Sequence, residues 1–154
     1  MSFDQITQVQ EISMDGFQVV SGSMFSNMPR SMRPTCTLWP GSINFSKYSI
    51  YLLNNCERVR IEVNTAKRCI LIVPVTASDR DGVRWMKSAG QKVDARKMDC
   101  SQFTQPLYEA WGWDRQYVYR AVGQLVTSDR KVMLLFDFNY PEKWKGKGLE
   151  KTDG

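Results

Sequence analysis

The 154-residue chain contains no histidine. Histidine is the base of most catalytic triads and the commonest metal ligand, so its absence excludes His-based nucleophilic catalysis and histidine metal sites. No stretch reaches the roughly 20 apolar residues of a membrane-spanning helix. The N-terminus, MSFDQITQVQ, has neither the basic region nor the apolar run of a secretory signal. We therefore expect a cytoplasmic protein that makes no membrane contact.

Cysteine is scarce, and its spacing is irregular. Cys36, Cys56, Cys69 and Cys100 include no C-x-x-C pair, so a four-cysteine zinc site fits poorly. Without a secretory signal, disulfides are also disfavoured. Cys69 lies in the apolar run CILIV, and nothing near Cys100 in the sequence resembles a base for a nucleophile. The pattern favours reduced structural thiols, and we expect neither a metal nor a cofactor.

Enzyme motifs are missing as well. The Gly146-Lys147-Gly148 segment follows no strand pattern and is no phosphate-binding loop. Asp79 and Asp81 are spaced closely enough for a Mg²⁺ site, but their polar loop context is more typical of solvated charge. We expect a non-enzymatic protein.

The charge is distributed unevenly along the chain. Lysine and arginine number 21 against 16 acidic residues, which gives a net charge of +5. Residues 1–21 carry three acidic residues and no basic one, so the remaining chain carries +8. A basic body is compatible with an anionic partner, nucleic acid first, although a merely soluble basic protein is the alternative.

Two blocks of the chain share one predicted order of elements. Residues 43–75 contain a short strand, a helix capped by Ser46, and strands over 58–64 and 69–75. Residues 98–140 repeat this order, with Ser101 as the cap and Leu107 in the place of Leu52. The predicted elements of the second block are a helix over 101–111 and strands over 117–126 and 132–138. The sequence thus predicts an α+β fold, in which two strand–helix–strand–strand pseudo-repeats surround a shared core.

Three further segments lie outside the two blocks. Residues 1–42 combine an N-terminal strand over 17–20 with a long Met- and Pro-rich arm, in which Pro29, Pro34 and Pro40 argue against regular structure. Residues 76–97 form a basic linker between the blocks. Residues 141–154 form a tail rich in lysine and glycine.

The residues of the first block follow the pattern of a known class of domain. The pattern is found in Ile43-Asn44-Phe45-Ser46-Lys47, Leu52-Leu53, residues 58–63, Lys67-Arg68 and residues 70–74. In this order they resemble the AbrB/MraZ class of bacterial swapped-hairpin domains. Ser46-Lys47 stands where that class usually has Pro-Lys, Tyr51 replaces a common helix arginine, and the glycine turn before the second strand is missing. The resemblance implies a DNA-binding fold in which two units pack as a homodimer or pseudo-dimer.

Basic residues provide the first candidate site. Arg58 and Arg60 share a strand face, Arg68 follows the hairpin turn, and the linker surrounds Trp85 with cations. Such interleaving is typical of contacts with phosphates and an exposed base or groove. The alternative places Trp85 in the core with Val83 and Met86. The candidate nucleic-acid-binding residues are Arg58, Arg60, Arg68, Arg80, Arg84, Trp85, Lys87, Lys92, Arg96 and Lys97.

The arm between residues 22 and 41 provides the second candidate site. It contains no acidic residue, and its methionines suit an adaptable protein-binding surface. The alternative is a loop whose methionines cover the sheet. The candidate partner-binding residues are Met24, Phe25, Met28, Arg30, Met32 and Arg33.

Together, these features predict a nucleic-acid-binding regulatory or accessory protein. The chain is similar in style to small proteins of bacterial phages and mobile elements, and its partner would be double-stranded DNA or a protein–nucleic acid complex. The alternative is a phage-encoded inhibitor that binds a host nucleic-acid enzyme such as a nuclease, as anti-CRISPR proteins do. Fold class does not separate the two functions, because function depends on the site.

Overall fold

The computed structural model describes residues 9–20 and 32–146. Of these described residues, 46% lie in strands and 13% in helices, so the fold is mostly β. No helix in the described part of the chain is long and apolar enough to cross a membrane. The helices are α2 (Lys47–Leu52) and α3 (Ser101–Ala110). The strands are β1 (Thr35–Trp39), β2 (Ser42–Phe45), β3 (Arg58–Asn64), β4 (Cys69–Val75), β5 (Val83–Arg84), β6 (Met86–Ala89), β7 (Lys92–Ala95), β8 (Met98–Asp99), β9 (Tyr117–Ser128), β10 (Lys131–Asp137) and β11 (Glu142–Lys145).

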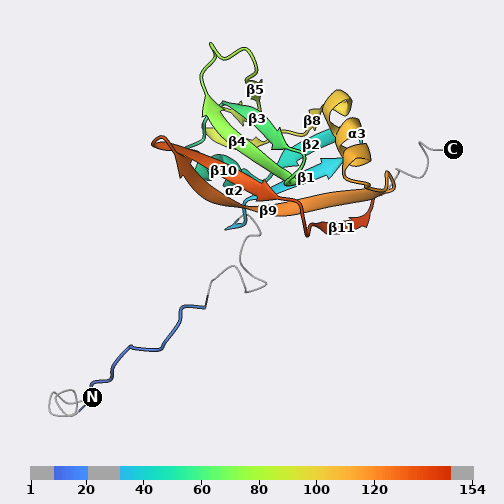
Figure 1. The fold of residues 1–154 in the computed structure, drawn as a ribbon. Coiled ribbons are helices and arrows are strands. Elements are labelled where there is room, and N and C mark those ends of the chain that lie inside the picture. Colours follow the sequence, from blue (N-terminus) through green and yellow to red (C-terminus); the bar gives the residue numbers. More distant parts are fainter. Residues whose placement is uncertain (1–8, 21–31, 147–154) are drawn as a thin grey trace.

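Nine of these strands form one antiparallel sheet that curls into a half-barrel (Figure 1). The strand order is β5-β3-β4-β10-β9-β1-β2-β8, and β11 pairs with β9 beside this path. Strands β6 and β7 form a separate hairpin. Because β5 and β8 are the two ends of the curled sheet, the half-barrel stays open between them.

Alternation of side chains explains the long strands at the centre of the sheet. In β10, Leu134 and Phe136 are fully buried, whereas Lys131 and Asp137 at its ends are exposed. Leu134 is the register partner of Ile72 in β4, which is also fully buried. Directly opposed residues share a face of a sheet, so the two strands line one side of the core together.

Gly123 marks the point where β9 changes partners. Strand β10 pairs with residues 123–128, β11 pairs with residues 117–120, and β1 pairs with residues 119–122. The ring of Phe136 lies against Gly123, where an added Cβ would be 2.6 Å from its Cε1 atom. A side chain at this position would displace the ring, so the absence of one permits the close approach.

Aromatic side chains fill the hollow of the half-barrel. The ring of Phe45 lies 5.4 Å from that of Trp85 and 5.7 Å from that of Phe136, measured between centroids. Helix α3 adds Tyr108, whose hydroxyl lies 2.9 Å from the carbonyl oxygen of Leu38 and 2.8 Å from that of Tyr117. These contacts attach α3 to β1 and β9.

The predicted α+β fold of two pseudo-repeats is wrong. Both predicted helices exist, but α2 has six residues and α3 has ten, and strands dominate the fold. The strands of the two blocks also do not form two units, because β4 of the first pairs with β10 of the second. Hydrophobic periodicity reports the local type of an element, whereas pairing depends on contacts between distant segments.

Segments predicted without strands contain β1, β5, β6, β7 and β11, of which β1, β5 and β11 join the nine-stranded sheet. The end of the predicted arm forms β1, which pairs with β2 and β9; Pro34 and Pro40 flank this strand and leave its N–H groups able to pair. The predicted linker contains β5, β6 and β7, and the predicted tail contains β11. Conversely, residues 17–20 form no strand in the structure.

The predicted helix caps have different outcomes. Ser46 caps α2 as predicted, and its Oγ atom accepts a hydrogen bond from the Ser49 amide at 3.4 Å. Asn54 and Asn55 follow the helix with φ of 59° and 55°, values that asparagine tolerates better than most residues. The prediction for α3 is wrong by one residue, because the N-cap is Cys100 and no side chain caps this helix.

Candidate nucleic-acid interface

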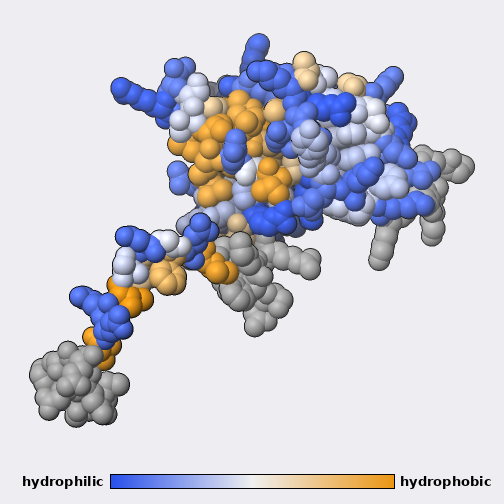
Figure 2. Space-filling model, turned by 60° about the horizontal axis from the view of Figure 1, so that its bottom comes forward, coloured by the Kyte–Doolittle hydropathy of each residue, from blue (hydrophilic) through white to orange (hydrophobic). Residues whose placement is uncertain are grey.

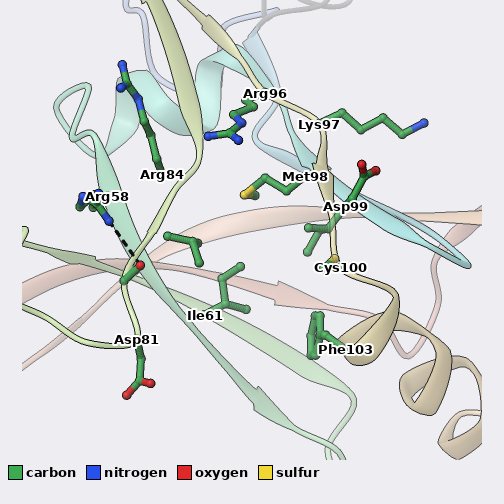
Figure 3. A pocket seen from close by; sticks show the side chains of 13 residues that line it. Arg58, Ile61, Asp81, Arg84, Arg96, Lys97, Met98, Asp99, Cys100 and Phe103 are labelled. Atoms are coloured by element: carbon green, nitrogen blue, oxygen red, sulfur yellow. Dashed lines mark hydrogen bonds between the residues drawn. The ribbon is translucent and has the colours of Figure 1, made fainter.

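A cleft of about 640 Å³ lies between the β3–β5 side of the sheet and the segment that leads through β8 into α3 (Figure 3). We call it the seam cleft, because it occupies the opening of the half-barrel. Its lining includes four cations, two carboxylates and an apolar part. The cations are Arg58, Arg84, Arg96 and Lys97, and the apolar part includes Ile61, Met98 and Phe103.

Two of the cations are held by the sheet itself. Arg58 of β3 and Arg84 of β5 are direct register partners. Arg58 donates from Nη1 to the carbonyl oxygen of Gly82 at 3.5 Å, and Arg84 donates from Nε to that of Met86 at 3.2 Å. Arg84 Nη2 also donates to the hydroxyl of Ser88 at 3.5 Å. Backbone and hydroxyl oxygens therefore orient these guanidinium groups without neutralising their charge.

The opposite side of the cleft is the link from β7 to β8. Figure 3 shows Arg96 of this link and Met98 of β8 pointing toward β3 and β5, whereas Lys97 and Asp99 point away. Lys97 Nζ lies 4.2 Å from the ring centroid of Trp39, so this cation also contacts an aromatic face outside the cleft. Asp81 points away from the centre as well.

Three arginines of the cleft lack a carboxylate partner. Within residues 9–20 and 32–146, the ion pairs involve Arg33, Arg60 and Arg120, and none involves Arg58, Arg84 or Arg96. The lining carries four cations against Asp81 and Asp99, a formal excess of two positive charges. The cleft is therefore suited to an anionic ligand.

Arg60 differs from its neighbour Arg58 in this respect. It pairs with Glu62 at 3.0 Å and with Asp79 at 2.8 Å. The pKa of Asp79 is lowered, first by the backbone N–H of Asp81 and then by the hydrogen bond from Arg60. Arg60 is thus neutralised on the sheet and does not line the cleft, although the sequence grouped it with Arg58.

Trp85 is fully buried, which corrects its assignment to the nucleic-acid site. Its indole Nε1–H donates to the carbonyl oxygen of Cys56 at 2.7 Å. A side chain with no exposed surface cannot stack on a base of a bound nucleic acid. Trp85 therefore lies in the core, as the alternative interpretation of the sequence predicted.

The remaining predicted cations lie outside the cleft. Arg68 has a φ of 56° in the β3–β4 turn, at the end of that hairpin remote from Arg58, and its carbonyl oxygen accepts from Phe138. Lys87 and Lys92 are exposed on the β6–β7 hairpin, where Lys87 opposes Asp94. Arg80 is exposed in the loop between β4 and β5.

The predicted partner-binding arm is only partly within the described structure. Met24, Phe25, Met28 and Arg30 lie outside the described residues. Met32 is 48% exposed, and Arg33 is bonded to Glu142 of β11 at 2.7 Å.

The sequence did not predict that apolar residues would line part of the cleft. Ile61 and Phe103 read as ordinary core positions of a strand and a helix, and Met98 as part of a short strand. All three are partly buried in the structure and meet at the cleft from β3, α3 and β8. No local signal in the sequence could have brought them together, because they are joined only by the curl of the sheet.

Neither nucleophile nor metal chemistry is favoured here. Burial and the charge of Asp99 raise the pKa of Cys100 to about 11, so its thiol is protonated at neutral pH and is a poor nucleophile. Among the residues that the structure describes, no three His, Cys, Asp or Glu side chains are grouped to hold a metal ion.

Comparison with known proteins found no matching family model, no matching curated protein and no matching solved structure. The resemblance of residues 43–74 to swapped-hairpin domains therefore stays a prediction.

Proposed function

We propose that the protein is a non-enzymatic nucleic-acid-binding regulatory or accessory protein whose seam cleft contacts phosphates. One observation carries the proposal: Arg58, Arg84 and Arg96 come from separate segments to one cleft without a carboxylate partner in the described chain. Phosphate oxygens would supply the counter-charge, and guanidinium groups bind them with paired hydrogen bonds.

The pairing of Arg58 with Arg84 supports a ligand for this cleft. Like charges directly opposed on neighbouring strands destabilise a sheet. Departures from such local rules are expected at functional sites, where binding requires an arrangement that folding alone disfavours. Phosphates bound at either guanidinium group would offset this repulsion.

The proposal is tested by the salt dependence of binding. Fluorescence anisotropy with a labelled oligonucleotide should give a log affinity that falls linearly with log salt, by about 0.7–0.9 for each phosphate contact. Arg58→Ala, Arg84→Ala and Arg96→Ala should each weaken binding and reduce this slope by about one contact.

Lys67→Ala is the matched control, because Lys67 is an exposed cation in the turn at the remote end of the β3–β4 hairpin. It should change the affinity by less than about twofold, since only diffuse charge is lost. Absence of binding at low salt, or equal effects of all four substitutions, would contradict phosphate binding by the cleft.

The protein-binding inhibitor is the second candidate function. Its specific support is the segment of residues 9–20, in which six apolar residues are 61–97% exposed, among them Phe17 and Val19. Figure 2 shows these side chains along the segment, and a further apolar area on the face of the sheet. An exposed apolar strip of this kind fits a partner protein better than a nucleic acid.

The two functions are separated by paired variants. On the inhibitor hypothesis, Phe17→Ala with Met32→Ala abolishes the cellular effect and leaves oligonucleotide binding intact. On the nucleic-acid hypothesis, Arg58→Ala with Arg84→Ala abolishes both the cellular effect and oligonucleotide binding. The variant with Phe17→Ala and Met32→Ala then behaves as the wild type. Unchanged melting transitions are required of both variants before they are compared.

A further inference from the structure

The apolar part of the seam cleft indicates which type of nucleic acid the cleft would bind. This inference rests on the proposed function. Ile61, Met98 and Phe103 are partly buried at the cleft. Phosphate groups gain nothing from contact with such side chains, whereas the face of a base does. A site that only tracked a phosphate backbone would need the cations alone.

The shape of the cleft also favours a single base over a duplex as its ligand. Its volume of about 640 Å³ lies within the range of sites for small molecules and cofactors. Proteins that read duplex DNA insert a protruding helix or a two-stranded ribbon into a groove, which a concave site between strands does not provide. In a duplex the bases are stacked and paired, so none enters such a cleft without being flipped out.

We infer that the seam cleft binds an unpaired nucleotide of a single strand. The base lies against Met98 and Phe103, and the adjoining phosphates contact Arg58, Arg84 and Arg96. Aromatic and thioether side chains accept any base face, so the cleft selects unpaired over paired nucleotides rather than one sequence. The sequence led us to expect double-stranded DNA or a protein–nucleic acid complex as the partner; this inference proposes a single-stranded segment in place of the duplex.

The first experiment compares three labelled probes by fluorescence anisotropy at one salt concentration. The probes are a 12-nucleotide single-stranded DNA, the same sequence as single-stranded RNA, and the matching DNA duplex. At least one single strand should bind about tenfold more tightly than the duplex, since only an unpaired base reaches the apolar part. The DNA and RNA arms show whether the 2′-hydroxyl matters.

Variants then separate the base from the phosphates. Met98→Ala and Phe103→Ala should each weaken single-strand binding by about tenfold and change duplex binding by less than twofold. Arg84→Ala should weaken binding of every probe. Tyr140→Ala is the control for an aromatic residue outside the cleft, because Tyr140 is 97% exposed after β10; it should bind as the wild type does.

Photo-crosslinking keeps the test valid if Phe103→Ala fails to fold. A single strand that carries 4-thiothymidine should crosslink, in the wild-type protein, to peptides that contain Met98 or Phe103. Crosslinks confined to other peptides would overturn the inference. Equal or tighter binding of the duplex would overturn it too and leave the proposed function standing, whereas failure of every probe to bind at low salt would reject the proposed function itself.

Discussion

Arg58 of β3 and Arg84 of β5 are direct register partners, and neither has a carboxylate within ion-pair distance in the described chain. Two residues along the same strand face, Arg60 is bonded to both Glu62 and Asp79. The fold thus neutralises one arginine of β3 and leaves a like-charged pair at the rim of the cleft. Arg58 and Arg60 thus share a strand face but differ in charge balance within the described chain.

Arg84→Glu should weaken nucleic-acid binding and stabilise the protein at the same time. The substitution replaces a repulsive cross-strand pair by an attractive one, which is worth roughly 0.2–1 kcal/mol. Loss of a phosphate contact should weaken binding of every oligonucleotide sequence and reduce the salt slope by about one. Urea denaturation and anisotropy measure the two effects, and Arg84→Gln should lie between wild type and Arg84→Glu in both. A variant that is less stable and binds equally well would contradict the role of this pair.

Gly123→Ala should destabilise the fold by about 1–3 kcal/mol, the usual cost of overpacking a core. The new methyl group would lie 2.6 Å from Cε1 of Phe136, and the ring cannot move freely because it is fully buried. Gly41→Ala is the control, since nothing lies within 4 Å of a Cβ there. Thermal unfolding of both variants tests the expectation; equal melting temperatures would show that the ring shifts at no cost.

Trp85→Phe should lower the free energy of unfolding by about 1–3 kcal/mol, because the carbonyl oxygen of Cys56 loses its buried donor. The folded variant should bind oligonucleotides within twofold of the wild type, since Trp85 has no exposed surface. Trp144→Phe, at a 38% exposed position, should change stability by less than about 0.5 kcal/mol. A selective loss of binding in folded Trp85→Phe would restore this residue to the site.

Glu142→Gln should reduce the acid sensitivity of the fold. Hydrogen bonds from Arg120 and then Arg33 lower the pKa of Glu142 below its ordinary value of 4.5. Its contribution to stability is therefore complete above about pH 4.5 and is lost as the pH falls through the lowered pKa of the folded protein. The effect is small because the carboxylate is 45% exposed and solvent screens it.

Melting temperatures between pH 6 and pH 3 provide the measurement for Glu142. The wild type should lose more stability over this range than Glu142→Gln, and the two curves should converge at the acid end. Glu109→Gln is the control, because Glu109 is exposed on α3 and forms no ion pair among the described residues. Parallel curves for wild type and Glu142→Gln would show that the ion pairs of Glu142 with Arg33 and Arg120 do not contribute to the pH dependence of stability.

Elements with local signals in the sequence could be predicted from it. The predicted strands over 58–64 and 69–75 coincide with β3 and β4, and 132–138 differs from β10 by one residue at each end. Alternating or continuous apolar residues mark such segments regardless of their partners. The cap at Ser46 was found for the same reason, because a cap bonds within its own first turn.

Strand pairing could not be predicted from local signals, and neither could the cations that lack an ion pair among the described residues. Nothing local places β4 against β10, or sets β1 between two strands of the sheet. The curl of the sheet brings Arg58 and Arg96 to one cleft, gives Arg60 a carboxylate from a distant loop, and encloses Trp85 in the core. These outcomes depend on contacts between segments far apart in the chain, and residue type and spacing carry no record of such contacts.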